Sequence, residues 1–204
     1  PLTASKLKHA ADVTTAAQNG LLVHHYALSG KAGGGSLLFP NPHGRPGIEY
    51  MSLSSCQQPE WRPQCSEVPM LTIDEFVAKH VDNDNPQPQK AVIPYMSIDV
   101  EGFDYTVMKA ARKSLARTAY LEFEYHHQGD WADQKLQNAV DMLKDDPFGF
   151  VCYWSGVNKL WKITNCWTDY FEFHKWSNIA CVSPQRQPIL AAKMEQVFEE
   201  TIAI

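Results

Sequence analysis

The stretch IPYMSIDVEGFDYTVMKAA, residues 93–111, joins a strand pattern to a helix pattern through a short acidic turn. Its first residues are mostly apolar at successive positions, as in a strand that is covered on both faces of a parallel sheet. From Phe103 onward, apolar residues recur at helical spacing. Asp99, Glu101 and Gly102 stand between the two patterns. Carboxylates at the end of a buried strand are costly unless they find partners or bind a ligand, so this turn is a candidate site.

The segments around this unit predict an α/β fold. We expect helices and strands to alternate in this order: a helix from 6 that ends near 19–20, strands 21–29 and 36–39, a strand ending at 72, a helix after 74–75, strand 118–127, helix 131–144, hairpin 148–163 and strand 178–183. This order favours a mainly parallel sheet with a C-terminal antiparallel hairpin. We expect a single domain over residues 1–204, with a peripheral C-terminal helix in 184–204.

Composition limits the class of protein. The 204 residues are 44% hydrophobic, which is enough to bury a substantial core. The net charge is −5, and the basic residues are scattered, so the sequence argues against a nucleic-acid groove. No apolar run approaches the roughly 20 residues of a membrane span. We expect a soluble domain, by default cytoplasmic, whose natural start lies upstream of Pro1; the sequence does not indicate the oligomeric state.

The cysteines follow no metal-binding spacing. They are Cys56, Cys65, Cys152, Cys166 and Cys181. Cys56 and Cys65 lie in one polar loop and are able to bridge in an oxidising compartment. The odd count and the moderate chain length nevertheless favour free thiols. With no compact ligand motif such as His-Glu-x-x-His, we expect no metal site.

The candidate site gathers polar residues at the ends of two consecutive strands. In open parallel sheets, ligands bind beyond the carboxyl ends of the strands. Asp99 stands at one such end, with Glu101 and Gly102 in the following turn, and the next strand ends in Glu124 and His126. If these strands are neighbours, one rim carries the acids and the imidazole. Alternatively, the acids cap the following helix and the histidine is solvated.

The stretch SIDVEGFDYTVMKAA, residues 97–111, resembles the signature of the FkbM-type methyltransferases. That signature reads Lys-Ile-Asp-Val-Glu-Gly, followed by a helix that ends in Gly-Ala. Here Ser97 replaces the lysine and Ala110 the glycine, while residues 98–102 match. Further segments occur in the family's order, namely YALSGKAGGGSLLFP, VPMLTIDEFV, LEFEYH and NIACVS. The resemblance extends over about residues 21–183.

The resemblance implies a class I, Rossmann-like fold that uses S-adenosylmethionine, commonly to methylate a hydroxyl group of a small molecule or glycan. The glycine-rich turn and the ribose-binding acid of that fold are not identifiable, which implies a partial, N-terminally truncated domain. The remaining cofactor contacts would come from the segment around Tyr26 and Ala27, and from Asp99 and Gly102. We expect weak or absent cofactor binding by this chain alone.

The resemblance also suggests catalytic roles. A hydroxyl acceptor benefits from a base that removes its proton, which is worth about 10²–10⁴ in rate. Asp99, Glu124 and His126 are the candidate bases, with Asp99 preferred. Asp99 alternatively orients the cofactor, and Glu101 holds acceptor hydroxyls. A non-catalytic binding or interaction domain that retains the methyltransferase scaffold is the alternative function, and a divalent-metal hydrolase ranks last.

Overall fold

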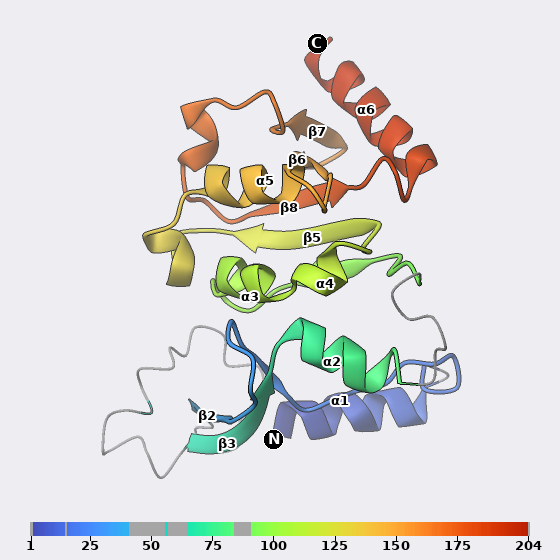
Figure 1. Cartoon of the computed structure of the whole chain (residues 1–204), viewed down its shortest axis with the longest axis vertical. Coiled ribbons are helices and arrows are strands. Elements are labelled where there is room, and N and C mark those ends of the chain that lie inside the picture. The colour runs from blue at the N-terminus through green and yellow to red at the C-terminus, as the bar shows by residue number, and fades with distance from the viewer. Residues whose placement is uncertain (1, 15, 41–55, 57–64, 84–90, 204) are drawn as a thin grey trace. The chain divides into compact units, whose positions relative to one another are not determined.

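The computed structural model describes residues 2–14, 16–40, 56, 65–83 and 91–203. It divides into two compact units, residues 1–72 and 73–204, which are described separately (Figure 1). The expectation of one domain over the whole chain stays a prediction.

The first unit contains a helix and a small mixed sheet. Its elements are α1 (Leu2–Val13), β1 (Ala27–Leu28), β2 (Ser36–Pro40) and β3 (Cys65–Leu71). The strand order is β1-β3-β2, with β1 parallel and β2 antiparallel to β3. The strand predicted at 21–29 forms only at its last residues, whereas the strand predicted at 36–39 is confirmed. Ala27, Val68 and Leu71 are buried in this unit.

The second unit contains the stretch from which the fold was predicted. Its helices are α2 (Ile73–His80), α3 (Asp104–Ala110), α4 (Arg112–Leu115), η5 (Gly129–Ala132), α5 (Leu136–Lys144), η6 (Asp169–Glu172) and α6 (Pro188–Ile202). Its strands are β4 (Met96–Ile98), β5 (Tyr120–Tyr125), β6 (Val151–Gly156), β7 (Lys159–Lys162) and β8 (Ser177–Val182).

These five strands form one sheet in the order β4-β5-β8-β6-β7. Only β4 and β5 are parallel; β8 is antiparallel to both β5 and β6, and β7 is antiparallel to β6. The prediction of a mainly parallel sheet is therefore wrong, because β8 enters between β5 and β6 and runs against both. The mixed α/β class and the β6–β7 hairpin are confirmed.

The main core lies on one face of this sheet. Leu121, Phe123 and Tyr125 alternate along β5 with less buried residues, and all three are buried. The apolar side of α5 is also buried, and in Figure 1 this helix lies in front of β6 and β8. A two-residue repeat in β5 is thus sufficient to place its apolar side chains in the interior.

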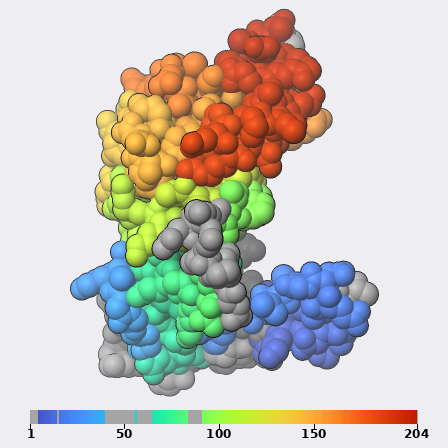
Figure 2. All heavy atoms as spheres, turned by 45° about the vertical axis from the view of Figure 1, so that its right-hand side comes forward, coloured from blue at the N-terminus to red at the C-terminus, as the bar shows by residue number. Residues whose placement is uncertain are grey.

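A second cluster lies on the opposite face. Tyr153, Ala180 and Val182 occupy alternate positions on β6 and β8, and Met194 of α6 packs against them. Lys162 of β7 and Tyr153 of β6 both contact the Glu195 carboxylate. Figure 2 shows α6, in red, as a ridge at one end of the second unit.

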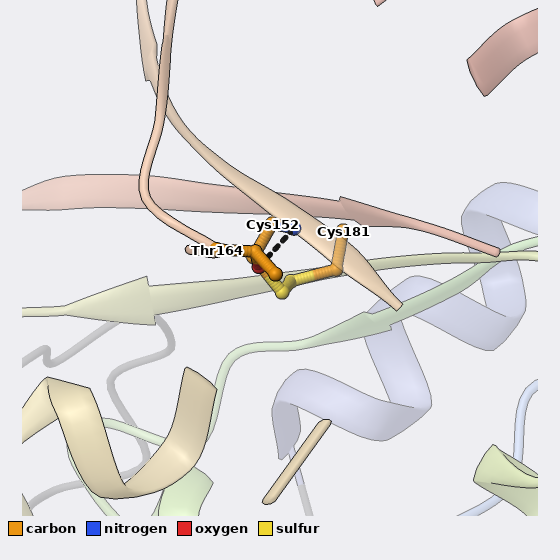
Figure 3. The surroundings of a disulfide bond; sticks show 3 residues. All are labelled: Cys152, Thr164 and Cys181. Carbon is orange, nitrogen blue, oxygen red and sulfur yellow. Dashed lines mark hydrogen bonds between the residues drawn. A yellow bond between two sulfur atoms is a disulfide. The ribbon is translucent and has the colours of Figure 1, made fainter. Parts of the chain in front are cut away.

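Four of the five cysteines form disulfides. Cys152 and Cys181 are direct partners across β6 and β8, and both are fully buried. The Thr164 hydroxyl accepts a hydrogen bond of 2.8 Å from the Cys152 amide beside this bridge (Figure 3). Cys56 is bonded to Cys65, and only the exposed Cys166 is a free thiol. The sequence preference for free thiols is wrong for these four, because strand pairing brings Cys152 and Cys181 together, and Cys56 is bonded to Cys65, nine residues further along the chain.

Candidate functional site at the ends of β4 and β5

The strands β4 and β5 are parallel neighbours, which is the condition that the candidate site required. Ser97 pairs with Glu122 and Ile98 with Phe123, so Asp99 follows β4 at the level where Glu124 stands on β5. The carboxyl ends of the two strands therefore meet at one rim of the sheet. Asp99 is exposed and Glu124 is partly buried.

The acidic turn has an unusual backbone. Glu101 has a φ of 54° and Gly102 a φ of 92°. A β-carbon on Gly102 would lie 2.6 Å from the carbonyl oxygen of Gln128, and one on Gly129 would lie 2.5 Å from the carbonyl oxygen of Gly102. The two glycines thus allow the turn after β4 to contact the turn after β5. The space around Gly102 is filled by protein backbone, and its contact with a cofactor stays a prediction.

Hydrogen bonds join these two turns. The Asp130 amide donates to the Gly102 carbonyl oxygen at 2.7 Å. The Asp130 carboxylate accepts from the amide of Thr106, in the first turn of α3, at 2.8 Å. A carboxylate is favourable there because it satisfies a helix N–H group that lacks an intrahelical partner. These hydrogen bonds consequently link the turn that follows β5 to the turn that follows β4 and to the start of α3.

His126 is buried beneath this rim rather than solvated. Its Nδ1 accepts a hydrogen bond of 3.0 Å from the Gln128 amide, so the neutral ring carries its proton on Nε2. Nε2 lies 3.6 Å from Glu124 Oε2. The ring stacks on Trp176 with centroids 4.8 Å apart.

Burial and neighbouring charges shift the pKa values of His126 and Glu124. Burial lowers the pKa of His126 below its usual 6.5, and His127 lowers it further, while Glu101 and Asp99 oppose the shift. His126 is therefore neutral at pH 7. Burial raises the pKa of Glu124 above its usual 4.5, and the charge of Asp99 adds to the increase, although a hydrogen bond from Trp176 opposes it.

The predicted rim residues are thus close enough for their charges to interact. Asp99 acts on both Glu124 and His126, and Glu101 acts on His126. Within the described part of the chain, no group of three or more His, Cys, Asp or Glu side chains is arranged to hold a metal ion.

Asp104 is a site residue that the sequence reasoning missed. It is fully buried at the start of α3, and its Oδ2 accepts a hydrogen bond of 3.1 Å from the Gly102 amide. Burial raises the pKa of this carboxyl from 3.8 to about 7, and the charge of Asp99 contributes to the increase. Its spacing from Val107, Met108 and Ala111 places it on the buried stripe of the helix. A carboxyl on an apolar stripe was the available signal.

Tyr26 and Ala27 lie in the first unit. Ala27 is a buried residue of β1, and the Tyr26 ring stacks on His24 at a centroid distance of 6.5 Å. Their predicted cofactor contacts stay predictions.

A hollow of about 400 Å³ lies elsewhere on the second unit, on the sheet face that carries α6. Its lining residues include the stacked Tyr95 and Tyr120, with Ala180 and Met194. None of the predicted site residues lines it. Apart from the two tyrosines it has no titratable lining group, so we place the candidate site at the rim, where the acids and the imidazole gather.

A rim of acids at the ends of neighbouring parallel strands is a position at which α/β enzymes bind ligands. The model of the Methyltransferase FkbM domain matches residues 4–151, well over half of the chain, so this chain belongs to the FkbM methyltransferase domain family. The family predicted from the sequence is confirmed, and the matched range includes Asp99, Glu101, Gly102, Glu124 and His126. Neither a curated protein nor a solved structure matches the chain. No helix among the described residues is long and apolar enough to cross a membrane.

Proposed function

We propose that this protein is an S-adenosylmethionine-dependent methyltransferase that methylates a hydroxyl group of a small molecule or glycan. The observation that supports this most is the parallel pairing of β4 and β5, which gathers Asp99, Glu124 and His126 at one rim in a chain of a methyltransferase family.

The charge of the rim fits the cofactor. When bound, S-adenosylmethionine supplies an activated methyl group on a positively charged sulfur, next to a cationic amino group. The exposed carboxylates of Asp99 and Glu101 have the complementary charge. Asp99 is suited to orient the cofactor, and Glu101 to accept hydrogen bonds from acceptor hydroxyls. Correct alignment of the reacting atoms is itself a large part of such catalysis.

Glu124 is the best-placed base. In neutral His126, Nδ1 is already an acceptor and Nε2 carries the proton, so neither nitrogen offers a free lone pair. His126 is therefore not the base; its Nε2 lies 3.6 Å from Glu124 Oε2 and makes no hydrogen bond among the described residues. The raised pKa makes that carboxylate a stronger base than an ordinary glutamate. Glu124 would take the proton of the acceptor hydroxyl, while the methyl carbon would exchange its bond to the cofactor's sulfur, which keeps the electron pair, for a bond to the acceptor oxygen.

The test is transfer of labelled methyl from S-adenosylmethionine to a panel of hydroxyl acceptors by the full-length protein. We expect Glu124→Gln to lower turnover by about 10²–10⁴. Glu122→Gln is the matched control, because Glu122 lies two positions earlier on the same side of β5 and hydrogen-bonds Tyr120 instead. Unchanged turnover in Glu124→Gln would refute the assignment of the base.

The non-catalytic alternative makes a different prediction. A binding domain would retain affinity for the cofactor or an acceptor but transfer no methyl group to any member of the panel. The transfer assay therefore separates the two functions, and calorimetric titration of the same protein, with S-adenosylmethionine and then with the acceptors, shows whether a protein that transfers no methyl group still binds them.

A further inference from the structure

We propose that Asp104 is a positioning residue whose buried carboxylate fixes the turn 99–103 in the shape that presents Asp99 and Glu101 at the rim. The inference deepens the proposed function and rests on it for its catalytic consequence, although its structural consequence is independent.

The geometry of Asp104 is that of an anchor beneath the turn. The residue is fully buried, and its Oδ2 accepts from the Gly102 amide at 3.1 Å. The backbone of Val100 also favours its ionised form. A carboxylate at this position therefore draws backbone N–H groups of the turn toward the first residue of α3. Because Glu101 lies between Val100 and Gly102, its backbone is fixed on both sides.

Asp104 is a poor choice for stability alone. Its Oδ1 has no hydrogen-bond partner among the described residues, and the charge of Asp99 disfavours its ionisation. A buried carboxyl without a basic partner normally destabilises a fold relative to an apolar side chain of similar volume. The hydrogen bond from the turn to Asp104 therefore explains a carboxyl at this position better than side-chain packing does.

The turn needs such an anchor. Glu101 has a φ of 54°, a conformation that a non-glycine residue keeps only when its surroundings impose it. The Gly102 carbonyl oxygen is held by the Asp130 amide, while the Gly102 amide is held by Asp104. Without the Asp104 carboxylate, the Gly102 N–H group loses this acceptor. The backbone of Glu101 is then free to leave its φ of 54°. Displacement of catalytic groups by about 1 Å is enough to lower rates about 10²-fold.

Two substitutions test the proposal. Asp104→Leu keeps the branched shape and the number of side-chain heavy atoms, with larger methyl groups, and removes the acceptor, whereas Asp104→Asn retains an oxygen that accepts from the Gly102 amide. We expect Asp104→Leu to lower methyl transfer by about 10² while its unfolding temperature at pH 8 equals or exceeds that of the wild type. We expect Asp104→Asn to keep most of the activity. Equal activity in wild type and Asp104→Leu, or an activity loss matched by a loss of stability, would overturn the positioning role.

Amide exchange gives a readout that needs no enzymatic activity. In Asp104→Leu we expect the Gly102 amide to exchange at least tenfold faster, while the amides of β5 keep their wild-type rates. Unchanged exchange at Gly102 would refute the anchor even in a protein that proves inactive. Faster exchange together with a wild type that transfers no methyl group would retain the anchor and reject the proposed function.

Discussion

The contact between Gly102 and Gly129 gives the most quantitative prediction. We expect Gly102→Ala to destabilise the second unit strongly, for two separable reasons. A side chain at φ 92° is unfavourable by about 1–2 kcal/mol. The new β-carbon would also lie 2.6 Å from the Gln128 oxygen and 2.9 Å from the Gln128 carbonyl carbon. Because these are backbone atoms, the overlap is relieved only by separating the two turns, which adds roughly 1–3 kcal/mol.

Gly149→Ala is the matched control for this variant. Gly149 has a φ of 63°, but nothing lies within 4 Å of a β-carbon built there. The control thus carries the conformational cost without the overlap, and we expect it to lose only about 1 kcal/mol. Urea denaturation of wild type and both variants provides the comparison.

The expected total for Gly102→Ala is about 2–5 kcal/mol, equivalent to a fall in Tm of roughly 10 °C for a chain of this length. Equal stability of Gly102→Ala and Gly149→Ala would show that the two turns do not touch in solution. That result would also show that the turns do not require a glycine at position 102 in order to approach each other.

Three further predictions concern the disulfides, Asp104 and Asp130. Thiol titration of the denatured, unreduced chain is expected to find one free thiol among the five cysteines. Cys152→Ser should lower the free energy of unfolding by about 3–4 kcal/mol, since the bridge to Cys181 closes a span of 29 residues. Finding five thiols would contradict both bridges. Because the folded pKa of Asp104 is raised from 3.8 to about 7, its contribution makes the fold less stable as pH rises from about 4 to 7. Asp104→Asn should therefore gain at most about 4 kcal/mol relative to wild type at pH 8 and little at pH 4, as measured by denaturation at both pH values; an equal gain at both would contradict this. Asp130→Ala should cost about 1–2 kcal/mol in the same assay, because the Thr106 amide in the first turn of α3 loses its acceptor, and an unchanged midpoint would contradict that role.

Local patterns predicted the local parts of the fold. The strand expected over residues 118–127 is found as β5, and the alternation of Leu121, Phe123 and Tyr125 accounts for their burial, because a strand has a side-chain period of two. The abrupt end of the apolar run at Asp99 correctly marked the end of β4, and the structure meets the condition that β4 and β5 are neighbours. The acidic rim follows from these two facts.

Local patterns did not predict the features that depend on segments far apart in the sequence. The residues of β8 read as a strand, but nothing local indicated its insertion between β5 and β6 against the direction of both. The bridge between Cys152 and Cys181 depends on that insertion. The close approach of Gly102 to Gly129, which explains the glycine after Glu101, likewise joins separate turns. Asp104 is different, because its place on an otherwise apolar helix stripe was a local signal that the sequence reasoning did not use.

The pH dependence of labelled methyl transfer by the full-length protein to a hydroxyl acceptor tests most directly whether Glu124 is the base of a methyltransferase. We expect kcat/KM to rise with pH through a single ionisation whose pKa lies above that of an ordinary glutamate, and we expect Glu124→Gln to abolish this rise and Glu122→Gln to retain it. A rise of the same size in Glu124→Gln would refute the base, and no transfer by the wild type to any hydroxyl acceptor would refute both the base and the proposed reaction.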